Sequence, residues 1–215
     1  MRKTIFYLLI GSFIFSGTCT AFAVAPSVRV LPTGGGYSVT CQEFGVEMRG
    51  DSVKSCFLAL PADLPGGNQT KIACAPKYAT AFRVDGRVEY CTLGSDMTFK
   101  RTAQDSVACK AGGRVVIRED GTVESATLKE STELPYAKGS TVACRGGSPV
   151  VFRADGNVAN CILDRESVFA AKEKKNLNKT CVVGGLIAFD EDGKFNGCYP
   201  PTPPKEAIPQ GGQNP

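Results

Sequence analysis

Residues 144–163 read CRGGSPVVFRADGNVANCIL, and this stretch decides the fold. Two runs rich in β-branched and apolar residues, 149–152 and 158–163, flank the dipeptide Asp155-Gly156. Asp-Gly between such runs is a strong signal for a β-hairpin, because a tight type I′ turn requires positive φ at both central residues. The sequence therefore predicts two antiparallel strands joined at Asp155-Gly156, with a cysteine near each end of the motif.

The register of this hairpin has two solutions. With a two-residue loop, Phe152 faces Ala159, and the alternation of strand side chains places Phe152, Cys161 and Leu163 on one face. A three-residue loop with a bulge pairs Phe152 with Val158 instead and divides those residues between the two faces. We expect the first register, because it gathers the apolar side chains into one buried stripe.

The same motif recurs along the chain. The first cysteines of five successive copies are 33, 35, 35 and 37 residues apart, a period typical of repeat proteins. The first copy is two residues shorter and lacks Asp-Gly, and the third has Ala126 where the second cysteine is expected, 17 residues after Cys109. The other four copies each predict a hairpin turn, at Asp85-Gly86, Asp120-Gly121, Asp155-Gly156 and Asp192-Gly193.

The N-terminus has the pattern of a secretory signal over residues 1–23. A basic start precedes an apolar run over 5–15, which is too short to span a bilayer, and Ala21-Phe22-Ala23 predicts cleavage before Val24. A lipoprotein anchored through Cys19 is the alternative. We therefore expect an exported protein, periplasmic or secreted, with no stable membrane span in the mature chain.

Cysteine usage predicts a disulfide framework. The chain has 10 Cys and no His, and an exported chain with this composition is typically braced by disulfides. Pairing within each unit leaves only Cys109 unpaired, whereas pairing across unit boundaries strands Cys41, Cys144 and Cys198; sequence alone leaves both schemes open. The within-unit bonds would be Cys41–Cys56, Cys74–Cys91, Cys144–Cys161 and Cys181–Cys198. Cys109 is then either a reactive free thiol or a buried, inert relic, and we favour the relic.

The remaining boundaries follow from composition. Residues 24–38 predict a flexible lead-in, 39–199 the five-unit repeat domain, and 200–215 a Pro-rich disordered tail. The predicted fold class is all-β, with five hairpin repeats of about 35 residues forming an elongated antiparallel sheet braced by disulfides. A closed, propeller-like arrangement of the five units is the alternative.

The repeat quoted above resembles the hairpin repeats of uncharacterised exported bacterial proteins. More loosely, over about residues 39–199, it resembles MORN-type repeats, in which successive hairpins extend one antiparallel sheet, although the period here is longer and the cysteine pairs are additional. The resemblance implies an extended sheet with an interaction role, and it supplies no catalytic residues.

Few residues carry signals for chemistry. Without His there is no Ser-His-Asp triad, Cys-His pair or His-ligated metal. Asp190-Glu191-Asp192 is the densest acidic cluster, but it lies on a predicted hairpin turn, and a calcium site needs six or more oxygens. The net charge of +4 falls to about +2 without the two basic residues of the signal, and no basic block indicates nucleic-acid binding.

We therefore predict no catalytic residue, metal or cofactor. The expected function is a non-catalytic binding or scaffold protein that presents its repeat sheet to a protein or an envelope polymer. The alternative is a carboxylate- or calcium-dependent hydrolase of the cell envelope.

Overall fold

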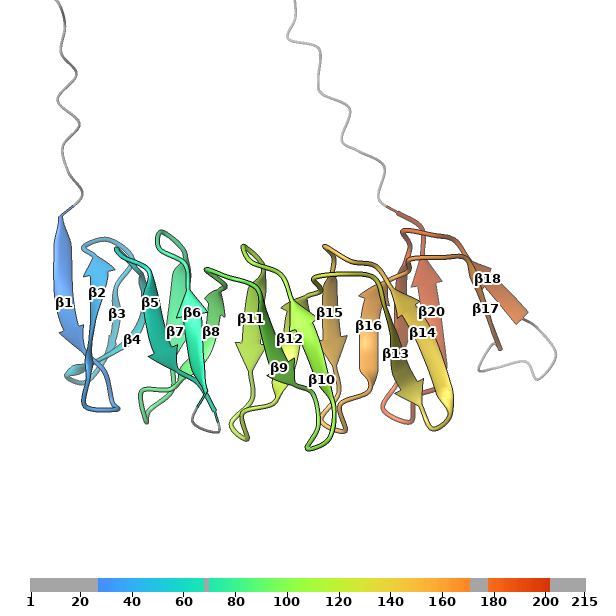
Figure 1. The fold of residues 1–215 in the computed structure, drawn as a ribbon, viewed down its shortest axis with the longest axis horizontal. Coiled ribbons are helices and arrows are strands. Elements are labelled where there is room, and N and C mark those ends of the chain that lie inside the picture. Colours follow the sequence, from blue (N-terminus) through green and yellow to red (C-terminus); the bar gives the residue numbers. More distant parts are fainter. Residues whose placement is uncertain (1–26, 68–69, 171–177, 202–215) are drawn as a thin grey trace, which may run out of the picture.

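The computed structural model describes residues 27–67, 70–170 and 178–201 (Figure 1). Over these residues the chain forms 20 β-strands and no helix, so none of them forms a helix that could cross a membrane. Ten strands form one continuous antiparallel sheet, and the other ten form five separate two-stranded hairpins. The all-β prediction is confirmed, and the sheet is open, so the closed alternative is wrong. The predicted signal at 1–23 and the tail from 202 onward lie outside the described residues.

The continuous sheet consists of five hairpins that pair in the order of the chain. Its strands are β3 (Glu47–Arg49), β4 (Ser52–Phe57), β7 (Ala79–Phe82), β8 (Val88–Thr92), β11 (Arg114–Ile117), β12 (Val123–Thr127), β15 (Pro149–Phe152), β16 (Val158–Ile162), β19 (Leu186–Phe189) and β20 (Phe195–Tyr199).

The other five hairpins, which we call the covering hairpins, stand in a row along one face of this sheet (Figure 1). Each precedes a sheet hairpin, so a repeat unit has four strands and two layers, where the sequence analysis predicted one. The covering hairpins are β1 (Val28–Pro32) with β2 (Ser38–Gln42), β5 (Ala62–Pro65) with β6 (Lys71–Cys74), β9 (Met97–Lys100) with β10 (Ser106–Cys109), β13 (Thr132–Ala137) with β14 (Ser140–Cys144), and β17 (Ser167–Ala170) with β18 (Asn178–Cys181).

The region predicted as a flexible lead-in contains the first of these strands. β1 pairs with β2 from Val28↔Gln42 to Pro32↔Ser38, so the prediction is wrong for residues 28–38. The glycines of this segment serve close packing, because a Cβ on Gly34 would lie 1.8 Å from the carbonyl oxygen of Val84 in the neighbouring turn. The repeat domain therefore begins at the first covering hairpin, about ten residues earlier than expected.

The core lies between the two layers. Phe152, Val158 and Leu163 from the fourth sheet hairpin and its exit are at most 2% exposed, and the residues at the same positions in the other units are buried with them, except Met48 in the first unit and Pro200 in the last. The covering hairpins contribute the opposite wall of the core, with Leu64, Ile72, Phe99, Val107, Leu134, Val142 and Phe169. Each hairpin thus has an apolar face because it is one half of a sandwich.

The register expected for the hairpin is wrong. Phe152 pairs with Val158, and the register then shifts so that Val151 pairs with Asn160. The extra residue, Ala159, forms a bulge that restores the alternation, so Phe152, Val158 and Cys161 are all buried. The bulge removes the reason for rejecting this register, because it keeps the apolar stripe on one face.

The turn is also not of type I′. Gly156 has φ +78° while Asp155 has negative φ, and the Gly156 N–H donates to the Arg153 carbonyl at 2.9 Å. This is a type I turn followed by a left-handed glycine, the usual three-residue hairpin loop. Glycine is required at position 156 because φ is positive there. The Asp155 carboxylate accepts a hydrogen bond from the backbone N–H of Asn157.

Each disulfide joins the two layers of its own unit. Cys144 ends β14 in a covering hairpin, and Cys161 lies in β16 of the sheet, with the Cα atoms 5.8 Å apart. The other bonds are Cys41–Cys56, Cys74–Cys91 and Cys181–Cys198, the connectivity that within-unit pairing predicts. Four disulfides indicate an oxidising, extracellular compartment.

Consecutive units are joined by a repeated pair of backbone hydrogen bonds. The Leu128 N–H donates to the Ser148 carbonyl at 3.0 Å, and its own carbonyl accepts from the Gly147 N–H at 2.8 Å. Leu58, Leu93 and Leu163 make the same two bonds to their following units. In the last unit this position is Pro200, which has no N–H, so the array cannot continue past β20 in the same way.

The residue that donates the second bond lies at a position of positive φ. Gly112, Gly147 and Gly184 occupy it in the third to fifth units, with φ between 72° and 76°, but Lys77 occupies it in the second with φ 69°. A left-handed conformation costs a residue with a Cβ roughly 1–2 kcal/mol. We expect Lys77→Gly to raise the free energy of unfolding by about 1 kcal/mol, measured by chemical denaturation. Lys110→Gly, at an exposed site without positive φ, should lower it, and the same sign for both variants would contradict this account.

Partly buried arginines form a second link between units. The Arg83 guanidinium donates to the Ile117 carbonyl, Arg118 to the Phe152 carbonyl and Arg153 to the Asp190 carbonyl. Each thus reaches the next unit, Arg83 and Arg118 at the equivalent position and Arg153 one residue further along. The last unit that the structure describes has Asp190 in place of the arginine, so it lacks this link.

Removing one of these arginines should weaken the whole array. Arg118 also donates to the Val123 carbonyl at 2.7 Å, so Arg118→Met leaves two partly buried carbonyls without their charged donor. We expect the free energy of unfolding to fall by about 2 kcal/mol, since hydrogen bonds to charged groups contribute roughly 1.5–3 kcal/mol. Arg165→Met, which removes an exposed pair with Glu133, should have a much smaller effect; equal losses would exclude the proposed link.

Candidate functional site

The aspartates of the hairpin turns serve the turns themselves. Each of the Asp85, Asp120 and Asp155 carboxylates accepts a hydrogen bond from the backbone N–H of the residue two positions later in the chain. The distances are 3.0, 2.8 and 2.9 Å. Hydrogen bonds from the side chain and backbone of Thr122 hold the pKa of Asp120 below its ordinary value. These carboxylates are therefore ionised turn caps, of the kind that makes Asp common in turns.

The acidic cluster at the last turn has the same explanation. The Asp190 carboxylate accepts the Lys194 N–H at 2.8 Å and the Asp192 N–H at 3.1 Å, and Asp192 pairs with the Lys194 ammonium at 3.2 Å. Among the described residues, no three His, Cys, Asp or Glu side chains are grouped in a way that could hold a metal ion. The cluster is thus part of the turn at Asp192-Gly193.

Cys109 is the one free cysteine within the described ranges, and it is buried. Burial raises the pKa of its thiol to about 12, so the thiol stays protonated at neutral pH. Ala126, its neighbour at the position of the missing partner, is 2% exposed. These surroundings are those of an inert core residue, because reactivity requires an accessible thiolate.

One face of the ten-stranded sheet is turned away from the covering hairpins, and we call it the outer face. Its residues were not identified from the sequence. Its central row crosses nine strands, and each residue pairs with the next. The row is Ser55, Ala81, Tyr90, Val116, Ser125, Val151, Asn160, Ala188 and Gly197.

None of these nine residues is charged, although the row continues on β3 with Glu47, which pairs with Ser55. The neighbouring row contains Phe57, Ala79, Thr92, Arg114, Thr127, Pro149, Ile162, Leu186 and Tyr199. Its one charged residue is Arg114, and the Arg114 guanidinium lies 4.1 Å from the centre of the Tyr90 ring. Solvent-facing sheets normally carry polar and charged side chains, so a long face with this few charges is typical of a surface that another molecule covers.

No family model, curated protein or solved structure matches this chain. The resemblance to MORN-type repeats therefore stays a prediction. What the candidate surfaces can do has to be argued from their own residues.

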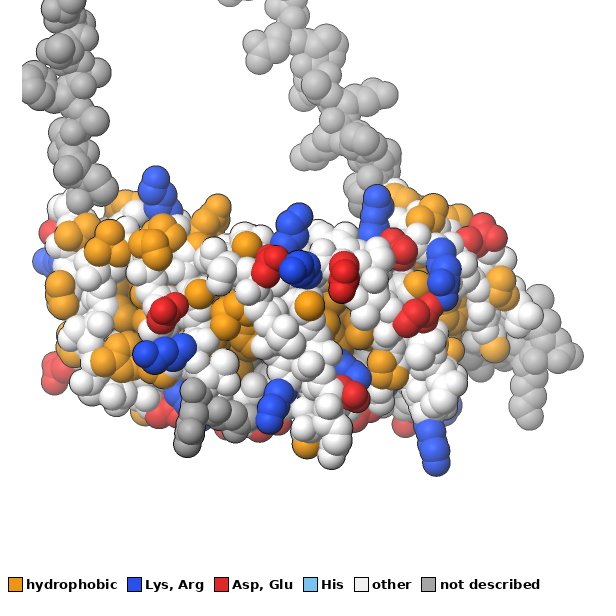
Figure 2. All heavy atoms as spheres, viewed as in Figure 1, with side chains coloured by type: hydrophobic (Ala, Val, Ile, Leu, Met, Phe, Trp, Pro, Cys, Tyr) orange, Lys and Arg blue, Asp and Glu red, His pale blue; other side chains and the backbone are white. Residues whose placement is uncertain are grey.

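The opposite face of the molecule is formed by the covering hairpins (Figure 2), whose turns lie on the Asp-Gly turns of the following unit. A Cβ on Gly67 would lie 2.0 Å from the Cα of Gly121, and a Cβ on Gly193 would lie 2.7 Å from the Tyr136 carbonyl oxygen. The covering turn and the Asp-Gly turn are thus in backbone contact. Whether the space between two adjacent covering hairpins is filled therefore depends on the size of the side chains beside these turns.

Two residues close each covering turn, eight and four positions before the first cysteine of the unit. We call them the closing pair: Thr33 and Tyr37, Gly66 and Thr70, Arg101 and Asp105, and Tyr136 and Ser140. In the first three pairs the N–H of the earlier residue donates to the carbonyl of the later one, at 2.7 to 2.8 Å. The backbone arrangement is thus conserved between these units while the side chains differ.

In the first and third closing pairs a large side chain reaches the Asp-Gly turn beneath it. The Tyr37 hydroxyl donates to the Gly86 carbonyl at 2.5 Å, and burial is the main cause that raises the pKa of Tyr37 to about 12. Arg101, which is 6% exposed, donates to the Gly156 carbonyl and to Asp105. Gly66 and Thr70 have no side chain long enough for such a contact.

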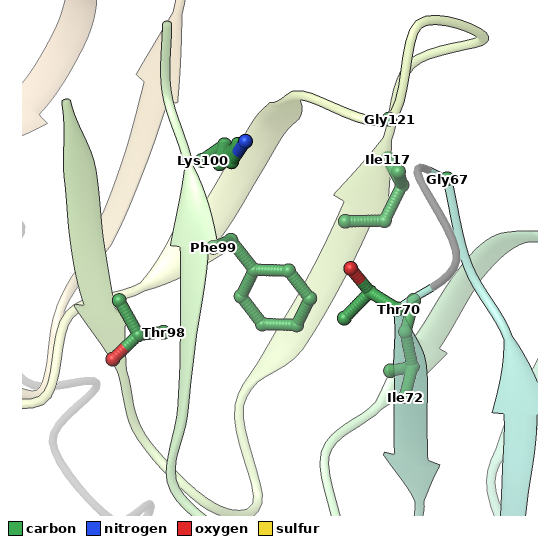
Figure 3. Close-up of a pocket in the computed structure, with 8 residues that line it drawn as sticks. All are labelled: Gly67, Thr70, Ile72, Thr98, Phe99, Lys100, Ile117 and Gly121. Carbon is green, nitrogen blue, oxygen red and sulfur yellow. The ribbon is translucent and has the colours of Figure 1, made fainter. Parts of the chain in front are cut away.

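A hollow of about 170 Å³ lies at that step, between β5–β6 and β9–β10. Figure 3 shows the Phe99 ring facing Ile117, Thr70 and Ile72, which lie together across from it. Lys100 stands at the rim, and the backbone of Gly67 and Gly121 completes the lining. A second hollow, at the equivalent step between β13–β14 and β17–β18, is lined by Tyr136, Ser140, Phe169, Lys194 and Phe195 among others.

Proposed function

We propose that this protein is a non-catalytic exported binding or scaffold protein that presents the outer face of its sheet to a protein or an envelope polymer. The observation that supports this most strongly is the central row of nine residues without a charge. Charged groups must lose their hydration when a surface is covered, so a face without them is covered at little electrostatic cost.

The shape of the face suits an extended partner. Strands in a sheet are spaced about 4.8 Å apart, so ten strands make a face roughly 45 Å long. Small side chains such as Ala81, Ser125 and Ala188 alternate with Tyr90, Val116 and Val151 along it. A long, nearly flat surface of this kind fits a second sheet or a linear polymer better than a small molecule, which needs a concave site.

A charge placed on the outer face should abolish binding. We expect Val151→Glu to weaken co-sedimentation of the mature protein with isolated cell envelopes of its own source at least tenfold, because the carboxylate must be desolvated in the complex. Thr141→Glu, at an exposed position of β14 in the covering layer, is the matched control and should bind as the unchanged protein does. Equal binding by Val151→Glu and the unchanged protein would exclude the outer face as the binding surface.

A further inference from the structure

Hollows lie at two of the steps between adjacent covering hairpins, and the one between β5–β6 and β9–β10 differs from the other in its closing pair. At the preceding step the space is occupied by Tyr37, and at the following step by Arg101, each of which donates to the carbonyl of a turn glycine. Only at the intervening step are both residues of the closing pair, Gly66 and Thr70, small. Protein interiors leave few voids larger than a water molecule, so an apolar space kept open here can receive a group from another molecule.

We propose that this hollow binds a single apolar side chain of a partner polypeptide, accompanied by a carboxylate that pairs with Lys100. It lies on the covering layer, so it is separate from the outer face and does not depend on the function proposed for that face.

The lining defines the apolar part of the ligand. Ile72 and Ile117 are each 1% exposed and Phe99 is 4% exposed, so the hollow has a rigid hydrocarbon floor. A volume of about 170 Å³ accommodates one side chain the size of Leu or Phe. It is well below the roughly 300–1,000 Å³ of sites for drug-sized ligands, which excludes a nucleotide or an oligosaccharide as the bound group.

The rim of the hollow defines the charged part of the ligand. Lys100 is exposed at the end of β9, and it pairs with no carboxylate of the residues that the structure describes. The second hollow has Ala170 at the position of Lys100, and the lysine that lines it, Lys194 of the sheet turn, is already paired with Asp192 at 3.2 Å. A carboxylate next to the inserted side chain can therefore pair with Lys100, and the two hollows differ in this respect.

Capped amino acids test the proposal with a defined probe. The mature protein, with its isoleucine methyl groups labelled, is titrated with N-acetyl-L-leucine while the Ile72 and Ile117 methyl resonances are followed by NMR. We expect saturable shifts of these two methyls with a dissociation constant on the order of millimolar, as befits a ligand of this size. N-acetyl-L-alanine, which cannot fill the hollow, should bind at least tenfold more weakly.

Two variants separate the parts of the proposal. Thr70→Tyr places at the small closing pair the residue that fills the first step, and it should abolish the shifts while the melting temperature does not fall. Lys100→Gln should weaken N-acetyl-L-leucine several-fold and leave N-acetyl-L-leucine amide unaffected, while Lys71→Gln, at a neighbouring exposed cation of β6, should change neither.

The contradicting results are equally specific. Absence of saturable shifts at Ile72 and Ile117 would overturn the site, as would unchanged shifts in a folded Thr70→Tyr variant. Equal binding of the acid and the amide would overturn the role of Lys100 and the carboxylate.

Discussion

Reduction of the four disulfides should unfold this protein at room temperature. Each bond closes a loop of 15 or 17 residues, and in the chain-entropy model a loop of about 15 residues contributes roughly 3 kcal/mol. Four such contributions, about 12 kcal/mol, are comparable to the whole net stability of a typical domain. Because every bond clamps a covering hairpin to its sheet hairpin, the reduced chain loses the link between its two layers in four of the five units.

The measurement is far-UV circular dichroism with and without a phosphine reductant, since the chain has no Trp to report unfolding by fluorescence. A double variant, Cys144→Ala with Cys161→Ala, isolates one bond and should lose about 3 kcal/mol in a denaturant titration. A reduced chain that keeps the native spectrum and melts cooperatively at the original temperature would show that the apolar core alone holds the layers together.

A fifth disulfide should form when Ala126 is replaced by cysteine. Cys109 and Ala126 occupy the positions of the bonded cysteines in the other units, both are buried, and the bonded pairs have Cα atoms 5.8 to 5.9 Å apart, within the usual range for a disulfide. Closing this 17-residue interval should raise the free energy of unfolding by about 3 kcal/mol. The third unit would then be braced like its neighbours.

Thiol counting and chemical denaturation check this prediction together. Oxidised Ala126→Cys should show no titratable thiol in denaturant, whereas the unchanged protein should show one. Ala126→Ser is the control, because it adds a buried hydroxyl without a bond and should lower stability. Two free thiols in the folded variant would mean that Cys109 and residue 126 do not face each other as the bonded pairs do.

The sequence predicted the repeat because cysteines and Asp-Gly turns carry their own geometry. The spacing between Cys144 and Cys161 measures a unit, and Ala126 marks one substitution in it. The covering hairpins were missed because Leu64 and Phe99 alternate with polar neighbours only over strands of four residues, too briefly to show a period. The glycines at 34–36 predicted flexibility, although Gly34 serves the close contact with Val84.

The candidate sites depend on relations between units that spacing alone does not contain. The register error at Phe152 shows this: one bulge at Ala159 decides which residues face outward, and only the correct register aligns Val151 and Asn160 on the outer face. The hollow depends on the covering turn of one unit lying on the Asp-Gly turn of the next, as Gly67 does on Gly121. An alignment of the closing pairs shows that Gly66 and Thr70 are small. It does not show that Ile72, Phe99 and Ile117 line a space beside them.

The most direct test of the five-unit, two-layer architecture is a disulfide map of the mature protein. The protein is alkylated in denaturant without reduction, digested, and analysed by mass spectrometry. The architecture predicts four bonds, each within one unit, and alkylation at Cys109 alone. Bonds between Cys56 and Cys74, Cys91 and Cys109, or Cys161 and Cys181, with three alkylated cysteines, would contradict it.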